Sequence, residues 1–416
     1  MEKRIITKLL LLINFVSLFI YPVTETLDVN TFRLLSFSLI NSFSLLYILI
    51  SGELTSILFK VLKSKISIAI VLFIIWGALS VAYAGNITQV FLRVLFFINF
   101  YFTFLTLYVF ISYNKIRAIH IAAFISILVL AQLYYSYNAL WAISRVTTYD
   151  FSFNELLKGR FPNRNITAAI YLYQLPFIIY IFQKSKSKII KIISAISILS
   201  LLHMIFLMSA RTSYIVIFVL GLVYVFLYII KREKEIFQFG LIFILSVLTS
   251  YLTSTYSLGT NNSAYVFNRM NTINFQEEST NTRLRYYEYG FQQFIKNPLI
   301  GVGLGNWKIE SIEKDKENII SYVIPYTMHN DFLEVAAELG IIGLSFYILI
   351  FLFALIYLYK HFIRNKFDPY LLALTSFIVV YLVDANLNFP FIRASQQLYL
   401  ALFLSLALYS KNYNTE

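Results

Sequence analysis

LEVAAELGIIGLSFYILIFLFALIYLY, residues 333–359, is the stretch that decides the fold of this chain. After Glu338 it carries no charged residue. A helix that spans a bilayer needs about 20 mostly apolar residues. Similar runs recur along the chain, whereas the strands of a membrane barrel alternate in segments of about ten residues. The sequence therefore predicts an all-α protein that crosses a membrane many times.

The composition supports this assignment. Of the 416 residues, 59% are hydrophobic and 13% are charged, whereas soluble domains average about 45–50% apolar and about 25% charged residues. The chain contains no cysteine, which excludes structural disulfides and thiolate metal sites. The amino terminus, MEKRIITKLLLLINF, has the basic start of a signal peptide but no small-residue cleavage site. We expect it to be retained as the first membrane helix.

We expect about twelve membrane-spanning helices, because apolar runs of sufficient length recur throughout the chain. The expected spans are residues 5–22, 32–50, 66–84, 90–111, 119–141, 166–183, 189–209, 212–230, 237–254, 333–359, 370–383 and 392–409. The chain then divides into residues 1–254 with the first nine helices, residues 255–330 with a large, partly helical loop, and residues 331–416 with the last three helices.

The distribution of basic residues predicts the orientation, since cytoplasmic loops of membrane proteins collect Lys and Arg. With the amino terminus inside, nineteen of the 34 basic residues fall in short cytoplasmic segments. Three loops expected on the other side, 23–31, 85–89 and 384–391, contain none. We therefore expect both termini inside and the 255–330 loop outside. The tendency of cytoplasmic loops to collect basic residues accounts for much of the net charge of +13, so this charge is no reason to expect a nucleic-acid partner.

The remaining basic residues lie on the expected outer side and are rich in arginine. Arginine can hold phosphate oxygens through two parallel hydrogen bonds, which lysine cannot. The pattern indicates a phosphate-bearing ligand, although each residue could instead hold a lipid headgroup or pair with an acid of its own loop. These residues are Arg33, Arg93, Arg145, Lys158, Arg160, Arg164, Arg211, Arg269, Arg283, Arg285, Lys296, Lys308, Lys314, Lys316 and Arg393.

The large loop contains an amphipathic segment at residues 281–296. Leu284, Tyr287, Phe291 and Ile295 follow helical spacing and form one apolar stripe. We expect a helix that lies on the outer membrane surface, with Arg283, Arg285 and Glu288 on its polar side. The alternative is that Arg285 and Glu288 simply form an exposed ion pair.

A glycine-rich string, NPLIGVGLGNW, follows at residues 297–307. Asn297 and Pro298 are expected to end the preceding helix. The string resembles a dinucleotide-binding fingerprint, but the strand before it and the helix after it are missing. The glycines more plausibly allow a tight turn or a close approach of two backbones.

His329 lies at the junction between the large loop and the apolar run of residues 333–359. Asp331 and Glu334 have the spacing of a capping box with Asp331 as the cap. The positive end of the helix dipole disfavours a charged imidazole, and a neutral imidazole is what a general base requires. His329 is therefore the candidate catalytic residue, the alternative being a hydrogen-bonding anchor. A structural role is expected for the other three histidines, which are His120, His203 and His361.

Several motifs in their order along the chain carry a resemblance to a known family. They are GRFPNRNITAAI (159–170), SARTSYI (209–215), an Arg-Leu-x-x-aromatic helix that begins at Arg283, NPLIGVGLGNW (297–307), HNDFLEVAAELGIIGL (329–344) and DANLNFPFIR (384–393). Together they resemble the O-antigen ligase and O-antigen polymerase superfamily of bacterial membrane glycosyltransferases. The resemblance covers roughly residues 150–400 and is most specific over 281–344.

The resemblance implies a multi-pass protein of the bacterial inner (cytoplasmic) membrane whose active face is periplasmic. The implied donor is a glycan on undecaprenyl diphosphate. A ligase passes this glycan to a sugar hydroxyl of the lipid A core in lipopolysaccharide biosynthesis, whereas a polymerase passes it to a growing glycan. Neither a metal, another cofactor nor a nucleotide sugar is implied. Besides donor and acceptor, membrane lipids are the expected partners.

The resemblance also assigns roles to individual residues. His329 would be the catalytic base, while Arg211 and Arg283 would bind the donor diphosphate. Arg285 lies two residues from Arg283 and could exchange roles with it, and Arg164 is a further candidate substrate-binding residue.

Three other functions stay open. A repeat-unit polymerase shares the fold and the chemistry, so the residues do not separate it from a ligase. A polysaccharide transporter is disfavoured because no charged residue falls at the middle of an expected span and no internal repeat is apparent. The last alternative is a scaffold for envelope assembly.

Overall fold

The protein is described by a computed structural model that covers residues 2–20, 29–145, 151–231, 234–256, 278–319, 327–365 and 368–410. Every regular element in these ranges is a helix. The described part contains eight helices that are long and apolar enough to cross a membrane, and shorter apolar segments lie in α9 (Arg211–Lys231), α10 (Lys234–Tyr256) and α16 (Ala394–Tyr409). The predicted all-α, multi-pass membrane fold is confirmed.

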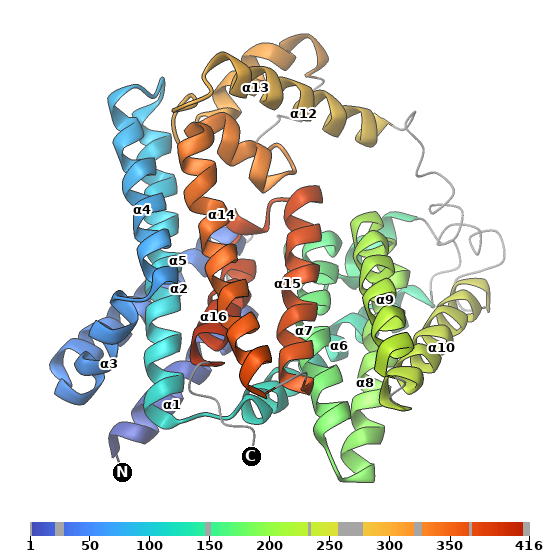
Figure 1. Ribbon diagram of the computed structural model, residues 1–416. Coiled ribbons are helices and arrows are strands. Elements are labelled where there is room, and N and C mark those ends of the chain that lie inside the picture. Colours follow the sequence, from blue (N-terminus) through green and yellow to red (C-terminus); the bar gives the residue numbers. More distant parts are fainter. Residues whose placement is uncertain are drawn as a thin grey trace. The chain divides into compact units, whose positions relative to one another are not determined.

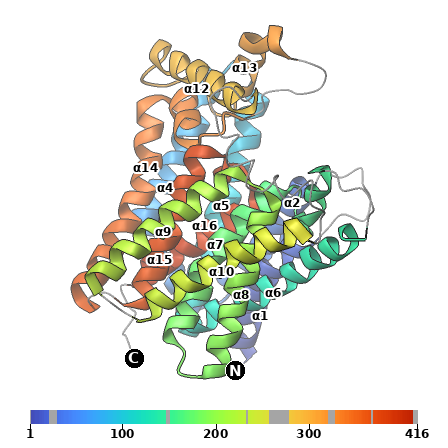
Figure 2. The same ribbon diagram turned by 90° about the vertical axis from the view of Figure 1, so that its right-hand side faces the viewer.

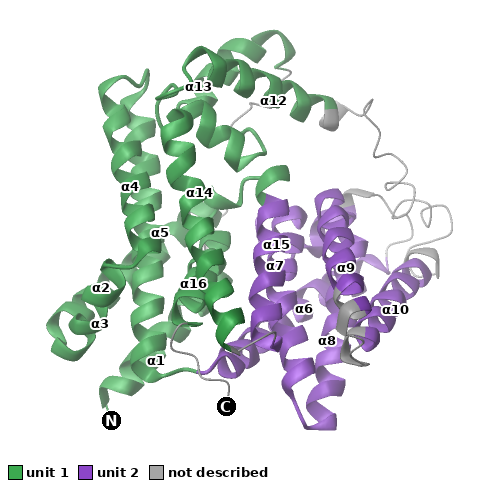
Figure 3. Cartoon of the chain, in the orientation of Figure 1, with its two compact units in different colours: residues 1–116, 278–366, 385–416 green, residues 117–277, 367–384 purple. Residues whose placement is uncertain are grey.

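The chain forms two compact units (Figure 3), and the first contains residues 1–116, 278–366 and 385–416. Its longest described helices are α5 and α14, and α16 packs along α5 while α4 packs along α14. Figures 1 and 2 both show α12 and α13 across the ends of α4 and α14. The helices of this unit, besides α16, are α1 (Glu2–Val16), α2 (Val29–Ile50), α3 (Gly52–Leu62), α4 (Lys65–Leu79), α5 (Ile87–Asn114), α12 (Glu278–Lys296), α13 (Trp307–Asp315) and α14 (Asp331–Asn365).

The second unit contains residues 117–277 and 367–384. Its helices are α6 (Ala118–Ile143), α7 (Arg164–Lys184), α8 (Lys188–Met208), α9, α10 and most of α15 (Pro369–Leu387). Within this unit α7 packs against α6 and α8. An apolar groove of about 410 Å³ lies between α9 and α10, and Gly221 and Gly240 leave it open because a Cβ at either position would meet nothing within 4 Å.

Each of the twelve predicted ranges overlaps a helix in the described part of the chain. Eleven of these helices are candidate spans or contain shorter apolar segments, whereas α1 (Glu2–Val16) is neither. Two helices lie where loops were expected. Residues 52–62 form α3, whose Leu54, Leu58 and Val61 are buried at helical spacing. Residues 307–315 form α13. Both are much shorter than a membrane span, so a search for long apolar runs passes over them. Within the predicted loop 255–330, residues 257–277 and 320–326 with Arg269 lie outside the described ranges.

The last long span is not one straight helix. Gly340 in α14 has φ +65° and ψ −167°, a backbone conformation that is not helical. An outer segment, Asp331–Leu339, is thereby set off from the apolar remainder of α14. A Cβ on Gly340 would lie 2.2 Å from the carbonyl carbon of Leu299, so a glycine is needed where the two backbones meet. The kink therefore separates the acidic outer turns of α14 from its spanning part.

Candidate functional site

His329 directly precedes the residue that caps α14. The cap is Asn330, whose Oδ1 accepts a hydrogen bond from the Leu333 N–H at 3.0 Å. The prediction that Asp331 caps this helix is wrong by one residue, because the asparagine side chain fills the same role. His329 itself has φ +61°, an uncommon value for a residue with a side chain. Its neighbours must therefore hold it in place.

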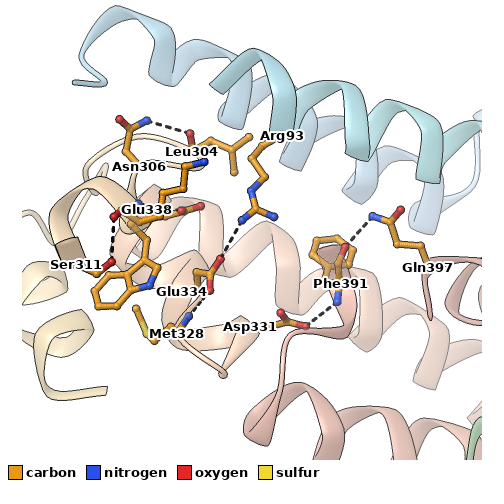
Figure 4. A network of polar contacts seen from close by, with 12 residues as sticks. Arg93, Leu304, Asn306, Ser311, Met328, Asp331, Glu334, Glu338, Phe391 and Gln397 are labelled. Atoms are coloured by element: carbon orange, nitrogen blue, oxygen red, sulfur yellow. Dashed lines mark hydrogen bonds and ion pairs between the residues drawn. The ribbon is translucent and has the colours of Figure 1, made fainter. Parts of the chain in front are cut away.

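Glu334 and Arg93 hold the turn that contains His329 (Figure 4). The Glu334 Oε2 accepts a hydrogen bond from the Met328 N–H at 2.8 Å. The Glu334 Oε1 lies 3.6 Å from the Arg93 Nη2 of α5. Glu334 is only 5% exposed, so both interactions are shielded from water. The buried carboxylate thus links α5 to the residue before His329.

A second carboxylate fixes the segment that surrounds the histidine (Figure 4). The Asp331 Oδ2 accepts a hydrogen bond from the Phe391 N–H at 3.0 Å, and the Phe391 carbonyl accepts one from the Gln397 Nε2 at 2.7 Å. The loop between α15 and α16 is thereby attached to the first residue of α14. Asn388, Phe389 and Arg393 belong to this loop or its end.

The surroundings of the imidazole come from α12 and from this loop. The ring of Phe389 meets the His329 ring edge-on, with the centroids 4.9 Å apart. The Asn388 side chain forms a hydrogen bond with the imidazole. The guanidinium of Arg393 lies 3.8 Å from the centroid of the Phe389 ring, a distance typical of a cation–π contact. On the other side, Tyr287 of α12 donates a hydrogen bond to the His329 carbonyl at 3.0 Å.

The electrostatics of the site keep His329 neutral. Burial lowers the pKa of His329 to about 3, and the positive charges of Arg283 and Arg393 act in the same direction, whereas the hydrogen bond with Asn388 opposes them. At neutral pH the ring is therefore uncharged and can accept a proton. Among the described residues, its buried Nδ1 has no hydrogen-bond partner.

The two candidate arginines of α12 have different partners. The Arg283 Nη1 donates a hydrogen bond to the Leu387 carbonyl at 3.1 Å, which places its charge beside His329. The Arg285 guanidinium instead binds Asp315 through two hydrogen bonds, from Nε at 2.7 Å and from Nη2 at 3.2 Å. Arg283 is the better candidate for binding a phosphate next to His329, because its charge acts on the imidazole while Arg285 is directed to Asp315 of α13.

The other two candidate arginines belong to the second compact unit. Arg164 is the first residue of α7, and its Nε lies 3.7 Å from the Glu155 Oε2. Arg211 is the first residue of α9, directly after the left-handed turn at Ser209 that ends α8. Both are half-buried. Their role in binding the substrate stays a prediction.

The glycine-rich string lies against the outer segment of α14. The Gly303 N–H donates to the Glu338 carbonyl at 2.8 Å, and a Cβ on Gly301, which has φ +70°, would lie 2.3 Å from the Glu338 carbonyl carbon. The expected close approach of two backbones is therefore confirmed. In the part of the chain that the structure describes, no group of three or more His, Asp or Glu side chains is arranged to hold a metal ion.

Sequence reasoning missed part of this site. Arg393 appeared only as one of many outer arginines, and Asn388 and Phe389 were not singled out as site residues. A usable signal was present, because all three lie in the string DANLNFPFIR that already contributed to the family resemblance. What the sequence lacks is the hydrogen bond from Phe391 to Asp331, which brings this string to His329.

Comparison with known proteins agrees with the resemblance seen in the sequence. A family model described as O-antigen ligase matches residues 195–348. The match covers less than half of the chain but includes Arg211, Arg283, Arg285 and His329. No curated protein matches the chain. The match supports the resemblance to the O-antigen ligase superfamily that the motifs indicate, and this family in turn supports a glycosyltransferase-like enzyme of the ligase or polymerase type.

Proposed function

We propose that this protein transfers a glycan from undecaprenyl diphosphate to a sugar hydroxyl of the lipid A core, on the periplasmic face of the bacterial inner membrane. The observation that carries the proposal is a neutral histidine beside two arginines, Arg283 and Arg393. A base next to clustered positive charge fits a reaction that deprotonates an alcohol and releases a diphosphate. The family match supports the same class of reaction.

His329 is the proposed general base. The acceptor hydroxyl attacks the anomeric carbon of the donor glycan and gives its proton to the imidazole. The bond between the anomeric carbon and the diphosphate oxygen breaks, and undecaprenyl diphosphate leaves with the bonding electrons. Attack from the face opposite the diphosphate inverts the anomeric centre. Burial and the neighbouring arginines keep the His329 ring unprotonated before the reaction, which is the form that a general base requires.

The arginines are proposed to stabilise the negative charge that develops on the departing diphosphate. Positioned cationic groups of this kind provide a large part of the rate enhancement in group-transfer enzymes. Arg283 and Arg393 are the proposed ligands beside His329, and Arg211 and Arg164 stay proposed substrate-binding residues on the basis of the sequence motifs alone. Arg285 is proposed as a supporting residue that holds α13 to α12 through Asp315.

The polyprenyl tail of the donor requires an apolar environment. The groove between α9 and α10 provides one within the second unit, and α9 begins at the candidate phosphate ligand Arg211. Its lining is almost wholly aliphatic and aromatic, with Phe218, Tyr224 and Phe243 among the side chains. Within the second unit, we propose this groove as a binding surface for a polyprenyl chain.

The proposal is tested with purified protein in phospholipid vesicles, a synthetic polyprenyl-diphosphate-linked glycan and a lipid A core acceptor. We expect release of polyprenyl diphosphate together with glycosylated core. Gly221→Phe, at a position where an added Cβ meets nothing within 4 Å, projects a ring into the groove and should raise the donor KM several-fold. Gly52→Ala, which also has open space around it, serves as the control. Elongated glycan without core modification would identify a polymerase instead, and an intact donor with either acceptor would refute both.

A separate prediction concerns Glu334, which we propose positions His329 without touching substrate. Glu334→Ala leaves the buried Met328 N–H without an acceptor, a change that costs about 1–3 kcal/mol. We expect kcat to fall about 5–150-fold while the donor KM stays close to its normal value, since about 1–3 kcal/mol corresponds to such a ratio. Glu334→Gln keeps an acceptor for this N–H and should recover most of the activity. Equal losses in both variants would contradict a positioning role.

A further inference from the structure

One flank of α12 and the turn that follows it expose large apolar side chains. Leu284, Phe291 and Ile295 are 44%, 54% and 60% exposed, and they share one line of the helix at i, i+7 and i+11. In the turn after the helix, Leu299 and Ile300 are 62% and 40% exposed. The opposite face of α12 already packs against the rest of its own unit, chiefly α14, and its Tyr286 and Gln293 are buried. The exposed row is therefore a second apolar surface.

The exposed row is continuous with the surface of a membrane span. The Pro298 carbonyl accepts a hydrogen bond from the Ile341 N–H at 2.8 Å, so the turn lies against α14 immediately after its kink. Ile341 is 43% exposed, and Ile348, Leu352 and Leu355 continue the exposed apolar face along α14. Since α14 is one of the candidate membrane spans, we expect this exposed apolar face to contact acyl chains, and the turn borders it.

The same turn is attached to the end of a second span. Tyr83 follows α4 and donates a hydrogen bond from its hydroxyl to the Ile300 carbonyl at 2.6 Å. It is 38% exposed. Tyrosines are enriched where membrane spans meet the headgroup region. The turn 298–300 is thus fixed between the end of α4 and the kink of α14, at the expected depth of the membrane interface.

The neighbouring flank of α12 is polar. Glu288 and Gln292 are exposed and joined by a hydrogen bond of 3.1 Å, and Lys296 at the end of the helix is exposed as well. Gln292 and Lys296 thus form a polar border beside the apolar row, and Glu288, seven residues before Ile295, interrupts the row between Leu284 and Phe291. An apolar row with a polar border is typical of a helix that lies in a membrane interface.

We propose that Phe291, Ile295, Leu299 and Ile300 form a wedge immersed in the acyl chains of the phospholipid leaflet nearest to α12. The wedge keeps the polar flank of α12 in the headgroup layer. Because α12 carries Arg283 and Tyr287, the leaflet then fixes the height of the site around His329. This last step rests on the proposed function, since it places the site at the depth where a lipid-linked diphosphate would lie.

The absence of cysteine from the chain makes the wedge directly measurable. Single substitutions Phe291→Cys, Ile295→Cys and Leu299→Cys, with Gln292→Cys as the matched control on the polar flank, accept a nitroxide label. The labelled proteins are placed in vesicles of phosphatidylethanolamine and phosphatidylglycerol. Collisions of the label with oxygen, which concentrates in acyl chains, are compared with collisions with a water-soluble nickel complex.

We expect the three wedge labels to collide mainly with oxygen and the label at position 292 to collide mainly with nickel. Nickel accessibility at all four positions would overturn the proposal, since the row would then face water. Low accessibility to both reagents, together with spectral broadening from labels on two neighbouring molecules, would also overturn the proposal. Such a result would show that a second copy of the chain covers the row. This measurement needs no catalytic activity, so its failure is distinct from a failure of the proposed function.

A functional arm links the wedge to the site. The double variant Phe291→Asp with Ile295→Asp should raise the donor KM several-fold in vesicles, whereas Gln292→Asp should not. If both variants behave like the wild type while the labels report acyl contact, immersion stands but its proposed effect on the site is wrong.

Discussion

Alanine in place of His329 is expected to lower glycan transfer by about 10²–10⁴-fold, the usual contribution of a positioned general base. In the proposed mechanism, the neutral imidazole beside the two arginines takes the proton from the hydroxyl of the acceptor sugar. Without it the hydroxyl must attack while still protonated. Transfer from the synthetic donor measures the effect, and the donor KM should change little because the arginines remain.

The matched control for this variant is His120→Ala. His120 is exposed in the first turn of α6, and we expect its loss to leave transfer unchanged. Both variants must accumulate in the membrane at the level of the wild type. Transfer by His329→Ala at the wild-type rate would remove the histidine from the mechanism.

The pH dependence follows from the pKa of His329, which is lowered to about 3. A base is active in its unprotonated form, so the rate should decline only when the pH falls toward about 3. Over the range in which an ordinary histidine titrates, about pH 5–8, the profile should be flat. A decline centred near an ordinary histidine pKa of about 6.5 would show that the imidazole is not shielded as described.

The membrane spans could be predicted from the sequence because each depends on its own apolar run. The same holds for the position of His329 before a helix, since Asn330, Asp331 and Glu334 mark a helix start within a few residues. The exact cap was wrong because Asn330 and Asp331 are both good caps, and the choice between them depends on contacts elsewhere. Asp331 is engaged by the Phe391 N–H, which leaves capping to Asn330.

The rest of the site depends on contacts between segments that are distant in sequence. Arg393 lies near His329 because Asp331 binds the backbone N–H of Phe391, and no local sequence pattern predicts that hydrogen bond. The same applies to the two arginines of α12. Arg283 and Arg285 look equivalent in the sequence, and only the position of Asp315 in α13 shows that Arg285 has a carboxylate partner.

Alanine in place of Arg283 is expected to reduce transfer about thirtyfold or more, since loss of one partner of a buried, hydrogen-bonded charge pair costs roughly 2–5 kcal/mol. The pair in question forms between the guanidinium and the donor diphosphate. The loss should therefore appear largely in the donor KM, in contrast to His329→Ala. Arg283→Lys keeps the charge but not the two parallel hydrogen bonds, so it should recover only part of the activity.

Two controls on α12 separate phosphate binding from a structural role. Lys296→Ala removes an exposed charge from the same helix and should be near neutral, as is usual for surface charges. Arg285→Ala leaves the buried Asp315 without its cation, and a second substitution, Asp315→Ala, should restore what that change loses because no unpaired charge then stays buried. Asp315→Ala should not restore Arg283→Ala, because Asp315 pairs with Arg285 and the proposed partner of Arg283 is the donor diphosphate. An unchanged donor KM in Arg283→Ala would refute its role as a phosphate ligand.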